Sequence, residues 1–431
     1  MDRGVGSVAR RLGNHDKSDF VEIMDQNSLR QLFPALGRKV YGKDLVYFDN
    51  AATIQRPHTV LDCWNGLALN SNANIHRAVH RMADEATEAY EQARLAVMDY
   101  IGASSREEIV FTSGATAAIN LVAYSFGEKF VGEGDEILVT EGEHHSNIVP
   151  WQLLCERKRA CLKVIPVDDT GHLQTDKLRE LCTPKTKLAA VTHISNVLGL
   201  VNPIGEIVDI CHSKGVKVLV DGAQGIVHTR VDVRKLGCDF YVFSGHKVYA
   251  VPGTGVLYGK KEILEMMPPF MSGGEMVGTV RFSGTTFAPL PLKFEAGTQN
   301  FTGQATLKPA LAIAAGISSD PELEKSGEDV KAYLYGALSR MDGLRMFGTT
   351  GVLSEKIPLF SFCIDGVHHE DLALVLDKMG IAVRSGQMCA EPLMDRFGVQ
   401  GMLRVSLAPY NTMQEAEYFM KSLERAVRML R

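Results

Sequence analysis

The chain has 431 residues, of which 45% are hydrophobic and 23% are charged, and its formal net charge is −5. This balance is typical of a globular protein rather than a disordered one, and a chain of this length has room for two domains. It contains no apolar run of about 18 residues or more, so no membrane span is expected. The slightly acidic charge gives no sign of a nucleic-acid surface, which usually shows a basic stripe.

The eight cysteines include no CxxC pair and no Cys/His spacing typical of a zinc site, so no metal is expected. A core of this size needs no disulfides, which favours a reducing, cytoplasmic location. The Gly- and Arg-rich segment 1–20 lacks the apolar stretch of a secretion signal. Its arginines leave an organelle targeting segment open, but its acidic residues favour a flexible arm.

Short β-branched runs alternate with helical stretches through the middle of the chain. We expect strands at residues 107–113, 135–141, 161–167, 187–195, 216–223, 238–244 and 255–260. These runs are apolar throughout, which suits a sheet covered on both faces. Their alternation with helices predicts an α/β fold with a mostly parallel, seven-stranded sheet. Such sheets bind ligands beyond the carboxyl ends of their strands.

The pattern changes past about residue 305. We expect an Ala-rich helix from Leu307, then a charged stretch, a strand at 359–365, a helix at 370–380, a strand at 381–385 and a closing helix after Thr412. The chain is therefore predicted to have three parts. These are an N-terminal arm and segment joining the smaller domain (1–40), a large domain (41–305) and a smaller α+β domain (306–431).

Lys247 and Asp221 each follow an apolar strand. A lysine at the carboxyl end of a sheet can be desolvated, which lowers its pKa and exposes a nucleophilic amine, although a lysine in a turn is more often simply exposed. Asp221 ends the strand VKVLVD, where a carboxylate needs a cationic partner. The protonated pyridine nitrogen of pyridoxal 5'-phosphate (PLP) is such a partner. Capping of the following helix is an equally good reading of Asp221 alone.

Two other strand ends carry candidate residues. Thr112–Thr116 joins a strand to a helix, where backbone N–H groups and the helix dipole would hold a phosphate. Ser113 or Thr116 acting as an ordinary N-cap is the alternative. His144 and His145 follow the strand DEILVTE, and an imidazole there can stack on a planar cofactor. Metal binding by both is awkward, because neighbours in a strand point to opposite faces.

Together these motifs resemble the class V aminotransferase-like group of fold-type I PLP enzymes, and within it the cysteine desulfurases of the Suf type. The resemblance runs from about Val46 to the C-terminus, which is nearly the whole chain. It is carried by VYFDNAA (46–52), NIHR (74–77), EHHSNIVPW (143–151), SNVLG (195–199), DGAQ (221–224), SGHK (244–247), FEAGT (294–298) and RSGQMC (384–389).

The resemblance implies a role for each matching residue. Lys247 carries PLP as a Schiff base and shuttles the Cα proton of the substrate, His144 stacks on the ring, and Asp221 pairs with the pyridinium. The other implied cofactor-binding positions are Gln224 and Asn196 near the phenolic oxygen, and Ala115, Thr116, Ser244, His246 and a partner subunit's Thr298 at the phosphate. The implied substrate-binding positions are His76, Arg77, Asn196, Arg384 and Arg404.

Cys389 matches the sulfur-accepting thiol of the family. A lone cysteine is more often a buried core residue, but the glycine-containing loop RSGQMC follows a predicted strand, which favours an accessible thiol. Arg384 nearby would favour the thiolate. The resemblance thus implies conversion of L-cysteine to L-alanine, with the sulfur left as a persulfide on Cys389 for iron–sulfur cluster assembly.

The sequence departs from the family pattern at three places. Ala115 stands where a second threonine is common, which removes a hydroxyl from the phosphate turn. Val248–Gly253 replaces the usual Tyr-Gly-Pro after the lysine, which leaves the conformation of this loop open. Gln387–Met388 replaces a frequent His-His pair, and with it an imidazole that would help to protonate a leaving group.

The resemblance also implies a homodimer, which Thr298 would complete, and a small Suf-type protein that accepts the sulfur. No nucleic acid and no membrane is expected as a partner. Two alternatives stay open: a selenocysteine lyase or another class V PLP enzyme, and a non-catalytic sulfur-binding scaffold. Lys247 and Asp221 together argue against the scaffold, because a protein that only binds sulfur needs neither an imine-forming amine nor a pyridinium partner.

Overall fold

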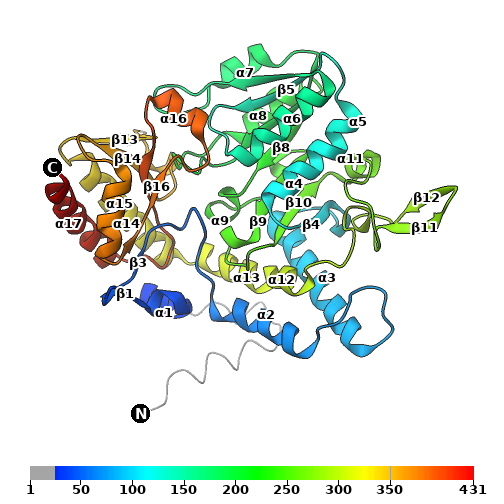
Figure 1. The fold of residues 1–431 in the computed structure, drawn as a ribbon, viewed down its shortest axis with the longest axis horizontal. Coiled ribbons are helices and arrows are strands. Elements are labelled where there is room, and N and C mark those ends of the chain that lie inside the picture. The colour runs from blue at the N-terminus through cyan, green and yellow to red at the C-terminus, as the bar shows by residue number, and fades with distance from the viewer. Residues whose placement is uncertain (1–24, 350) are drawn as a thin grey trace.

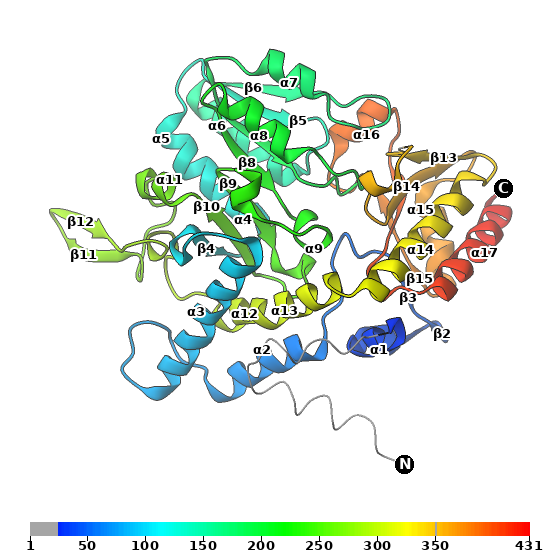
Figure 2. The same cartoon turned by 180° about the vertical axis from the view of Figure 1, so that it is seen from behind.

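The computed structural model describes residues 25–349 and 351–431, so most of the arm expected at 1–40 lies outside the described residues (Figure 1). Two sheets of different size organise the described chain, one of seven strands and one of four. They form a large and a small lobe that lie side by side in both views (Figures 1 and 2). No helix of the described part is both long and apolar enough to span a membrane.

The large sheet has the strand order β4-β10-β9-β8-β7-β5-β6. Its strands are β4 (Ile109–Thr112), β5 (Glu136–Thr140), β6 (Cys161–Ile165), β7 (Thr186–Thr192), β8 (Lys217–Asp221), β9 (Phe240–Ser244) and β10 (Gly255–Gly259). β10 runs antiparallel to its two neighbours, and the other pairs are parallel. The predicted α/β fold with a mostly parallel, seven-stranded sheet is confirmed.

Both faces of this sheet are covered. In β8, Val218 and Val220 pack into one hydrophobic core, whereas Leu219 between them packs into another. The first face is covered by α2 (His58–Asn70), α3 (Arg81–Ile101), α7 (Thr175–Leu181), α8 (Ile204–His212), α12 (Phe301–Ala305) and α13 (Leu307–Ser318). The second is covered by α4 (Ala115–Val122), α6 (Val149–Lys158) and α11 (Lys261–Met266). Burial on both sides explains why the strands are apolar throughout.

The small sheet is antiparallel, with the order β13-β14-β17-β16. Its strands are β13 (Leu344–Phe347), β14 (Leu359–Ile364), β16 (Arg384–Gly386) and β17 (Met402–Ser406), and it packs on α14 (Pro321–Ser339), α15 (His369–Lys378) and α17 (Met413–Leu430). Thr412 and Glu415 form a capping box that satisfies the first backbone N–H groups of α17. A further helix, α16 (Glu391–Phe397), packs in a separate small core.

Two local expectations are wrong in detail. The strand expected at 381–385 is divided, because β15 (Ile381–Ala382) pairs with β3 (Val46–Tyr47) while β16 pairs with β17. The strand expected from 107 begins instead as a helical turn at Arg106–Glu108. The charged stretch before residue 331, for which no element was predicted, forms the first half of α14, and Pro321 is tolerated in its first turn.

The N-terminal part of the described chain crosses to the small lobe. It contains α1 (Gln26–Gln31) and the strands β1 (Lys39–Val40), β2 (Lys43–Asp44) and β3. Val46 and Phe48 pack in the core of the small lobe, and Arg30 pairs with Glu415 at 2.8 Å. The domain boundaries at residues 41 and 306 stay a prediction.

The remaining short elements are α5 (Glu128–Phe130), α9 (Gly225–His228), α10 (Val233–Leu236), β11 (Val277–Arg281) and β12 (Gly284–Phe287). β11 and β12 form a hairpin that projects from the large lobe in both ribbon views (Figures 1 and 2). Phe282 at its tip is fully exposed.

Candidate active site

The predicted site residues follow strands that end at one edge of the large sheet. β5, β7, β8 and β9 are mutually parallel, and β4 runs in the same direction because both β4 and β9 are antiparallel to β10. Their carboxyl ends therefore lie together, as the sequence predicts.

Lys247 ends a helical turn, Gly245–Lys247, directly after β9. Burial lowers the pKa of the Lys247 amine, and the Asp221 carboxylate opposes this effect. Asp221 is 4% exposed, and its Oδ1 accepts a hydrogen bond from the Ala223 N–H at 2.9 Å. Burial raises the pKa of Asp221, so its surroundings do not fully stabilise the negative charge. A buried carboxylate of this kind fits the pyridinium of PLP, and the amine fits its aldehyde.

The turn between β4 and α4 meets the end of β9. The Ala115 N–H donates to Ser244 Oγ at 2.8 Å. Gly114 has a φ of 152°, and a Cβ on Gly255 would lie 2.4 Å from the Gly114 Cα, so this approach of two backbones requires glycine at residue 255. Thr116 lies exposed in the first turn of α4. Backbone N–H groups at a helix start beside a serine hydroxyl fit a phosphate group, and Ala115 contributes through its backbone rather than through a hydroxyl.

His246 lies in the helical turn Gly245–Lys247 that follows Ser244. Its Nδ1 lies 3.3 Å from Thr53 Oγ1. Burial lowers the pKa of His246 to about 4, with Lys247 and Arg56 adding to the effect. The imidazole is therefore neutral near pH 7 and meets a phosphate as a hydrogen-bonding group.

The ring of His144 is held in one tautomer. The Ser146 N–H donates to His144 Nδ1 at 3.1 Å, which places the proton of the neutral ring on Nε2. Burial lowers the pKa of His144 to about 4, and Lys247 contributes to the shift. A neutral imidazole suits stacking on a cofactor ring.

Glu143 is a functional candidate that the sequence interpretation missed. It is fully buried and accepts hydrogen bonds from Thr140 Oγ1 at 2.6 Å, Asn147 Nδ2 at 2.7 Å and the Thr192 N–H at 2.7 Å. Burial, with a smaller contribution from Asp221, raises the pKa of Glu143 to about 8 despite these hydrogen bonds. The network fixes the backbone from which His144 projects. The feature of the sequence that indicates Glu143 is its position, as an acidic residue, just after an apolar strand.

Arg404 lies on β17 and is 3% exposed. It donates through Nη1 to the Asn196 carbonyl oxygen at 2.8 Å and through Nη2 to Asp49 Oδ1 at 3.0 Å. Within the described chain its Nε has no hydrogen-bond partner. Burial lowers the pKa of Arg404, and Asp49 opposes this. A buried guanidinium with an open N–H fits the carboxylate of an amino acid.

Arg384 also reaches Asp49, with 3.4 Å between its Nε and Asp49 Oδ2. Asp49 thus lies between the two arginines that the resemblance assigns to substrate binding. The sequence interpretation gave Asp49 no role, although it lies within the matched stretch 46–52.

The Cys389 loop connects β16 to α16 and leaves the Cys389 side chain exposed. Met388 and Cys389 adopt left-handed backbone conformations, with φ of 53° and 55°. Asn196 Nδ2 donates to the Met388 carbonyl oxygen at 2.9 Å, and the His145 N–H donates to the Cys389 carbonyl oxygen at 2.8 Å. The charge of Cys389 also acts to raise the pKa of Lys247. The small lobe therefore delivers its thiol to the site on the large lobe.

At two of the three places where the sequence departs from the family pattern, the side chains have defined contacts. Met388 is 8% exposed and packs in the core formed with α16, so its side chain contributes to packing. Tyr249 is 1% exposed, has a φ of 70° and packs against Phe33 with ring centroids 5.7 Å apart. The first four residues of the altered loop, Val248–Val251, are thus buried in the core, while Pro252 and Gly253 are exposed.

Other predicted residues have different surroundings. Gln224 Nε2 donates to the Ala51 carbonyl oxygen at 2.7 Å. His76 Nε2 lies 3.3 Å from Glu91, and Arg77 pairs with Glu275 at 2.8 Å. Thr298 is exposed. The roles assigned to these four residues stay predictions.

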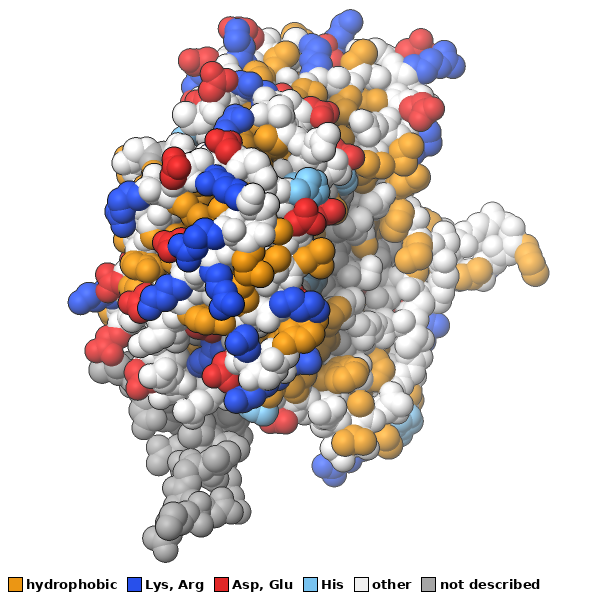
Figure 3. All heavy atoms as spheres, turned by 60° about the vertical axis from the view of Figure 1, so that its left-hand side comes forward, with side chains coloured by type: hydrophobic (Ala, Val, Ile, Leu, Met, Phe, Trp, Pro, Cys, Tyr) orange, Lys and Arg blue, Asp and Glu red, His pale blue; other side chains and the backbone are white. Residues whose placement is uncertain are grey.

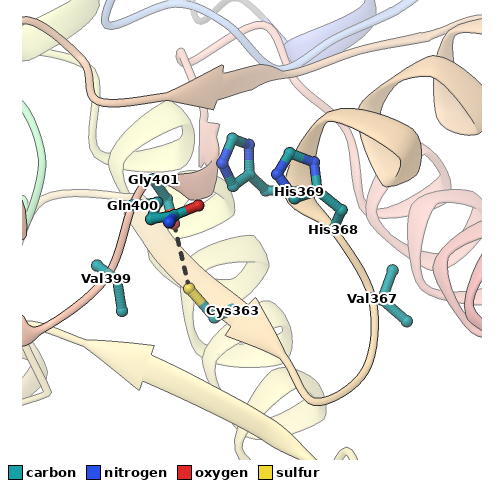
Figure 4. A pocket seen from close by; sticks show the side chains of 7 residues that line it. All are labelled: Cys363, Val367, His368, His369, Val399, Gln400 and Gly401. Carbon is teal, nitrogen blue, oxygen red and sulfur yellow. Dashed lines mark hydrogen bonds between the residues drawn. The ribbon is translucent and has the colours of Figure 1, made fainter.

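Among the described residues, no group of three or more His, Cys, Asp or Glu side chains is placed to hold a metal ion. A separate pocket of about 220 Å³ lies in the small lobe, and Figure 4 shows the Cys363 thiol and two histidines around it. Its lining residues are Cys363, Val367, His368, His369, Val399, Gln400 and Gly401, and none is a predicted site residue.

Comparison with known proteins agrees with this geometry. The model of the class-V aminotransferase family matches residues 46–419. The chain therefore belongs to the class-V aminotransferase family. This family is PLP-dependent, so the predicted cofactor and enzyme class are confirmed.

Similar proteins within the family are cysteine desulfurases. A probable cysteine desulfurase of Vibrio cholerae is 45% identical, over 95% of this chain and 100% of that protein. A cysteine desulfurase of Cronobacter sakazakii is 44% identical, over 93% of this chain and 98% of that protein. The crystal structure of the Escherichia coli cysteine desulfurase CsdA superposes with a TM-score of 0.87 at 37% identity, covering 95% of this chain and 100% of that one.

Proposed function

We propose that this protein is a PLP-dependent cysteine desulfurase that converts L-cysteine to L-alanine and keeps the sulfur as a persulfide on Cys389. The observation that carries the proposal is the Cys389 loop. Its thiol is exposed, while the carbonyl oxygens of Met388 and Cys389 are bonded to Asn196 and His145 of the large lobe. A nucleophile held beside an amine that can bind the cofactor is the arrangement that sulfur transfer needs.

Each side chain has a defined task in this proposal. Lys247 and Asp221 hold PLP, with Ser244 and the turn before α4 at its phosphate. Bound PLP supplies an electron sink for charge that develops on the substrate Cα. The Lys247 amine, with its pKa lowered by burial, moves the proton at Cα. Arg404 binds the substrate carboxylate through its open Nε.

Sulfur transfer then takes place at Cys389. Its thiolate attacks the substrate Sγ, the Sγ–Cβ bond breaks, and the electron pair of that bond stays with the carbon skeleton that leaves as alanine after protonation. The enzyme thiol and cysteine thus become an enzyme persulfide and alanine, with no external oxidant or reductant. His144 is neutral and has a proton on Nε2, so it donates a hydrogen bond in the site rather than a proton.

We further propose the type of desulfurase, its oligomeric state, its sulfur acceptor and its location in the cell. The motifs from residue 46 onward support the Suf type and a role in iron–sulfur cluster assembly. Exposed Thr298 and exposed apolar side chains such as Leu69, Val79 and Phe282 support a homodimer. Figure 3 shows the surface hollowed between the two lobes. The exposure of the Cys389 side chain supports access of a small sulfur-acceptor protein to it. We place the protein in the cytoplasm because its eight cysteines are free.

The test is incubation of the PLP-loaded protein with L-cysteine, followed by measurement of alanine and sulfide and by mass analysis of the Cys389 peptide. We expect alanine from the wild type and one added sulfur on Cys389. Cys389→Ser abolishes both, whereas Cys161→Ser, which alters another exposed thiol, changes neither. Persulfide formation that persists in Cys389→Ser contradicts the assignment. Faster turnover of selenocysteine than of cysteine supports a selenocysteine lyase instead.

The non-catalytic scaffold is tested separately. We expect a visible absorbance band that borohydride removes in the wild type and that Lys247→Ala lacks. A wild-type protein without this band would act as a scaffold.

A further inference from the structure

Asp49 connects three parts of the chain that are far apart in sequence. It follows β3, its backbone pairs with Ser406 at the end of β17, and its carboxylate lies 3.0 Å from Arg404 Nη2 and 3.4 Å from Arg384 Nε. Arg384 and Arg404 face each other across the β16–β17 pair. One carboxylate thus joins both arginines.

The backbone around Asp49 is fixed independently of the two arginines. Asn50 Nδ2 donates to the Ser406 carbonyl oxygen at 2.8 Å, and the Ala51 N–H donates to Ser406 Oγ at 2.9 Å. Gln224, on the loop after β8, donates to the Ala51 carbonyl oxygen at 2.7 Å. Asp49 is therefore a rigid anchor to which a flexible arginine side chain adjusts.

The charges show what Asp49 does for Arg404. Burial lowers the pKa of Arg404, and Arg384 lowers it too, while Asp49 is the carboxylate that opposes both. The side chain of Asp49 is 17% exposed and that of Arg404 is 3% exposed, so water screens their attraction little. With Nη1 held by Asn196 and Nη2 held by Asp49, the rotation of the guanidinium is set, and among the residues that the structure describes Nε has no hydrogen-bond partner.

We propose that Asp49 is a positioning residue for substrate: it orients the Arg404 guanidinium so that the open Nε receives the carboxylate of the amino acid. Through Arg384 the same carboxylate anchors the start of β16, the strand that leads to Cys389. This inference rests on the proposed function for the identity of the substrate, but its geometry applies to any α-amino acid.

The test uses a pair of ligands that differ only in the carboxylate. L-Alanine and ethylamine are titrated into PLP-loaded enzyme, and binding is followed by the change in cofactor absorbance. In Asp49→Ala we expect the Kd for L-alanine to rise about tenfold, the typical cost of losing a hydrogen bond to a charged group. The Kd for ethylamine stays unchanged. In turnover, the KM for L-cysteine rises about tenfold while kcat changes less than threefold.

Two further variants make the result specific. Asp49→Asn keeps an acceptor for Arg404 without the charge, so its Kd for L-alanine lies between those of the wild type and Asp49→Ala. Asp169→Ala removes another carboxylate–arginine pair, 2.7 Å from Arg396 on the surface, and leaves both Kd values unchanged.

If Asp49→Ala weakens the binding of L-alanine and of ethylamine equally, the inference is overturned, because the whole site is then damaged. Unchanged binding of alanine in both Asp49→Ala and Asp49→Asn also overturns it. If Asp49→Ala does not fold, Asp49→Asn alone decides. A wild type that binds alanine in an Asp49-dependent way but releases no alanine from cysteine leaves this inference standing and contradicts the proposed function.

Discussion

Arg94 and Arg404 are both buried beside carboxylates, but they differ in how completely their donors are used. Arg94 is 0% exposed and donates to Glu295 at 2.7 and 2.9 Å, to Glu91 at 3.1 and 3.2 Å and to the Ile109 carbonyl oxygen at 2.8 Å. Burial alone would lower the pKa of Arg94, but Glu295 and its other neighbours raise it.

Arg404 is buried to a similar degree, yet its pKa is lowered and its Nε has no partner within the described chain. The Arg94 cluster is thus saturated, and the Arg404 cluster is open. A saturated pair stabilises the fold, whereas an open one has donors left for a ligand. The two clusters therefore differ in unmet hydrogen bonds rather than in burial.

We expect the largest effect on stability when a substitution breaks the saturated Arg94 cluster. Arg94→Ala leaves the buried Glu295 carboxylate without its arginine partner, so we expect the free energy of unfolding to fall by about 3–5 kcal/mol. Urea unfolding measures this loss. Arg396→Ala, in a partly exposed pair, is the matched control and costs less than about 1 kcal/mol. A loss below about 1 kcal/mol in Arg94→Ala would show that the network does not hold the fold.

The second effect tests the open cluster. In Arg404→Ala we expect kcat/KM for L-cysteine to fall about 10²- to 10³-fold, because truncating one partner of a buried charged contact costs about 3–4 kcal/mol. The free energy of unfolding falls less than in Arg94→Ala, since Asp49 keeps Arg384 as a partner. Steady-state kinetics and urea unfolding on one preparation check both points. A larger loss of stability than in Arg94→Ala would reverse the comparison.

A third buried basic group, His193, extends the comparison to a case in which burial is the only cause of the pKa shift. It is 6% exposed, and burial lowers its pKa to about 4 from 6.5. The unfolded chain therefore binds more protons between these values, and stability is lost as pH falls from about 6.5 towards 4. We expect this group to account for about 2 kcal/mol of the loss between pH 7.5 and pH 5.

His193→Gln removes the titrating ring, so its unfolding free energy depends less steeply on pH in that window. Unfolding at pH 7.5, 6 and 5 measures the slope. Identical slopes in the variant and the wild type would exclude His193 as a source of the acid sensitivity.

The smallest effect concerns a helix cap that makes no direct contact with either cluster. Thr412→Ala removes the side chain that accepts from the Glu415 N–H at 3.2 Å at the start of α17, and we expect a loss of about 1 kcal/mol. Serine at this position restores the cap. Because Thr412 contacts neither cluster, kcat/KM stays unchanged, and a change there would mean that the small lobe transmits strain to the site.

The large sheet and most of the site were predictable because strand ends are encoded locally. Apolar runs predicted the strands, and parallel pairing brought Asp221, Ser244 and Lys247 to one edge. Asp49 was not predictable, since its partners come from the last part of the chain. The division of 381–385 was missed for the same reason, because β3 captures Ile381 and Ala382. Contacts between distant segments leave no local periodicity to detect.

The pairing of β3 with β15 has a consequence for how the protein forms during synthesis. Val46 and Phe48 belong to the core of the small lobe, but the whole large domain separates them in sequence from Ile381. As the chain leaves the ribosome, these early apolar residues must wait until almost the entire polypeptide has emerged before they can be buried. The large sheet can assemble first, and the small lobe closes last, with the Cys389 loop brought to the large lobe in the same final step.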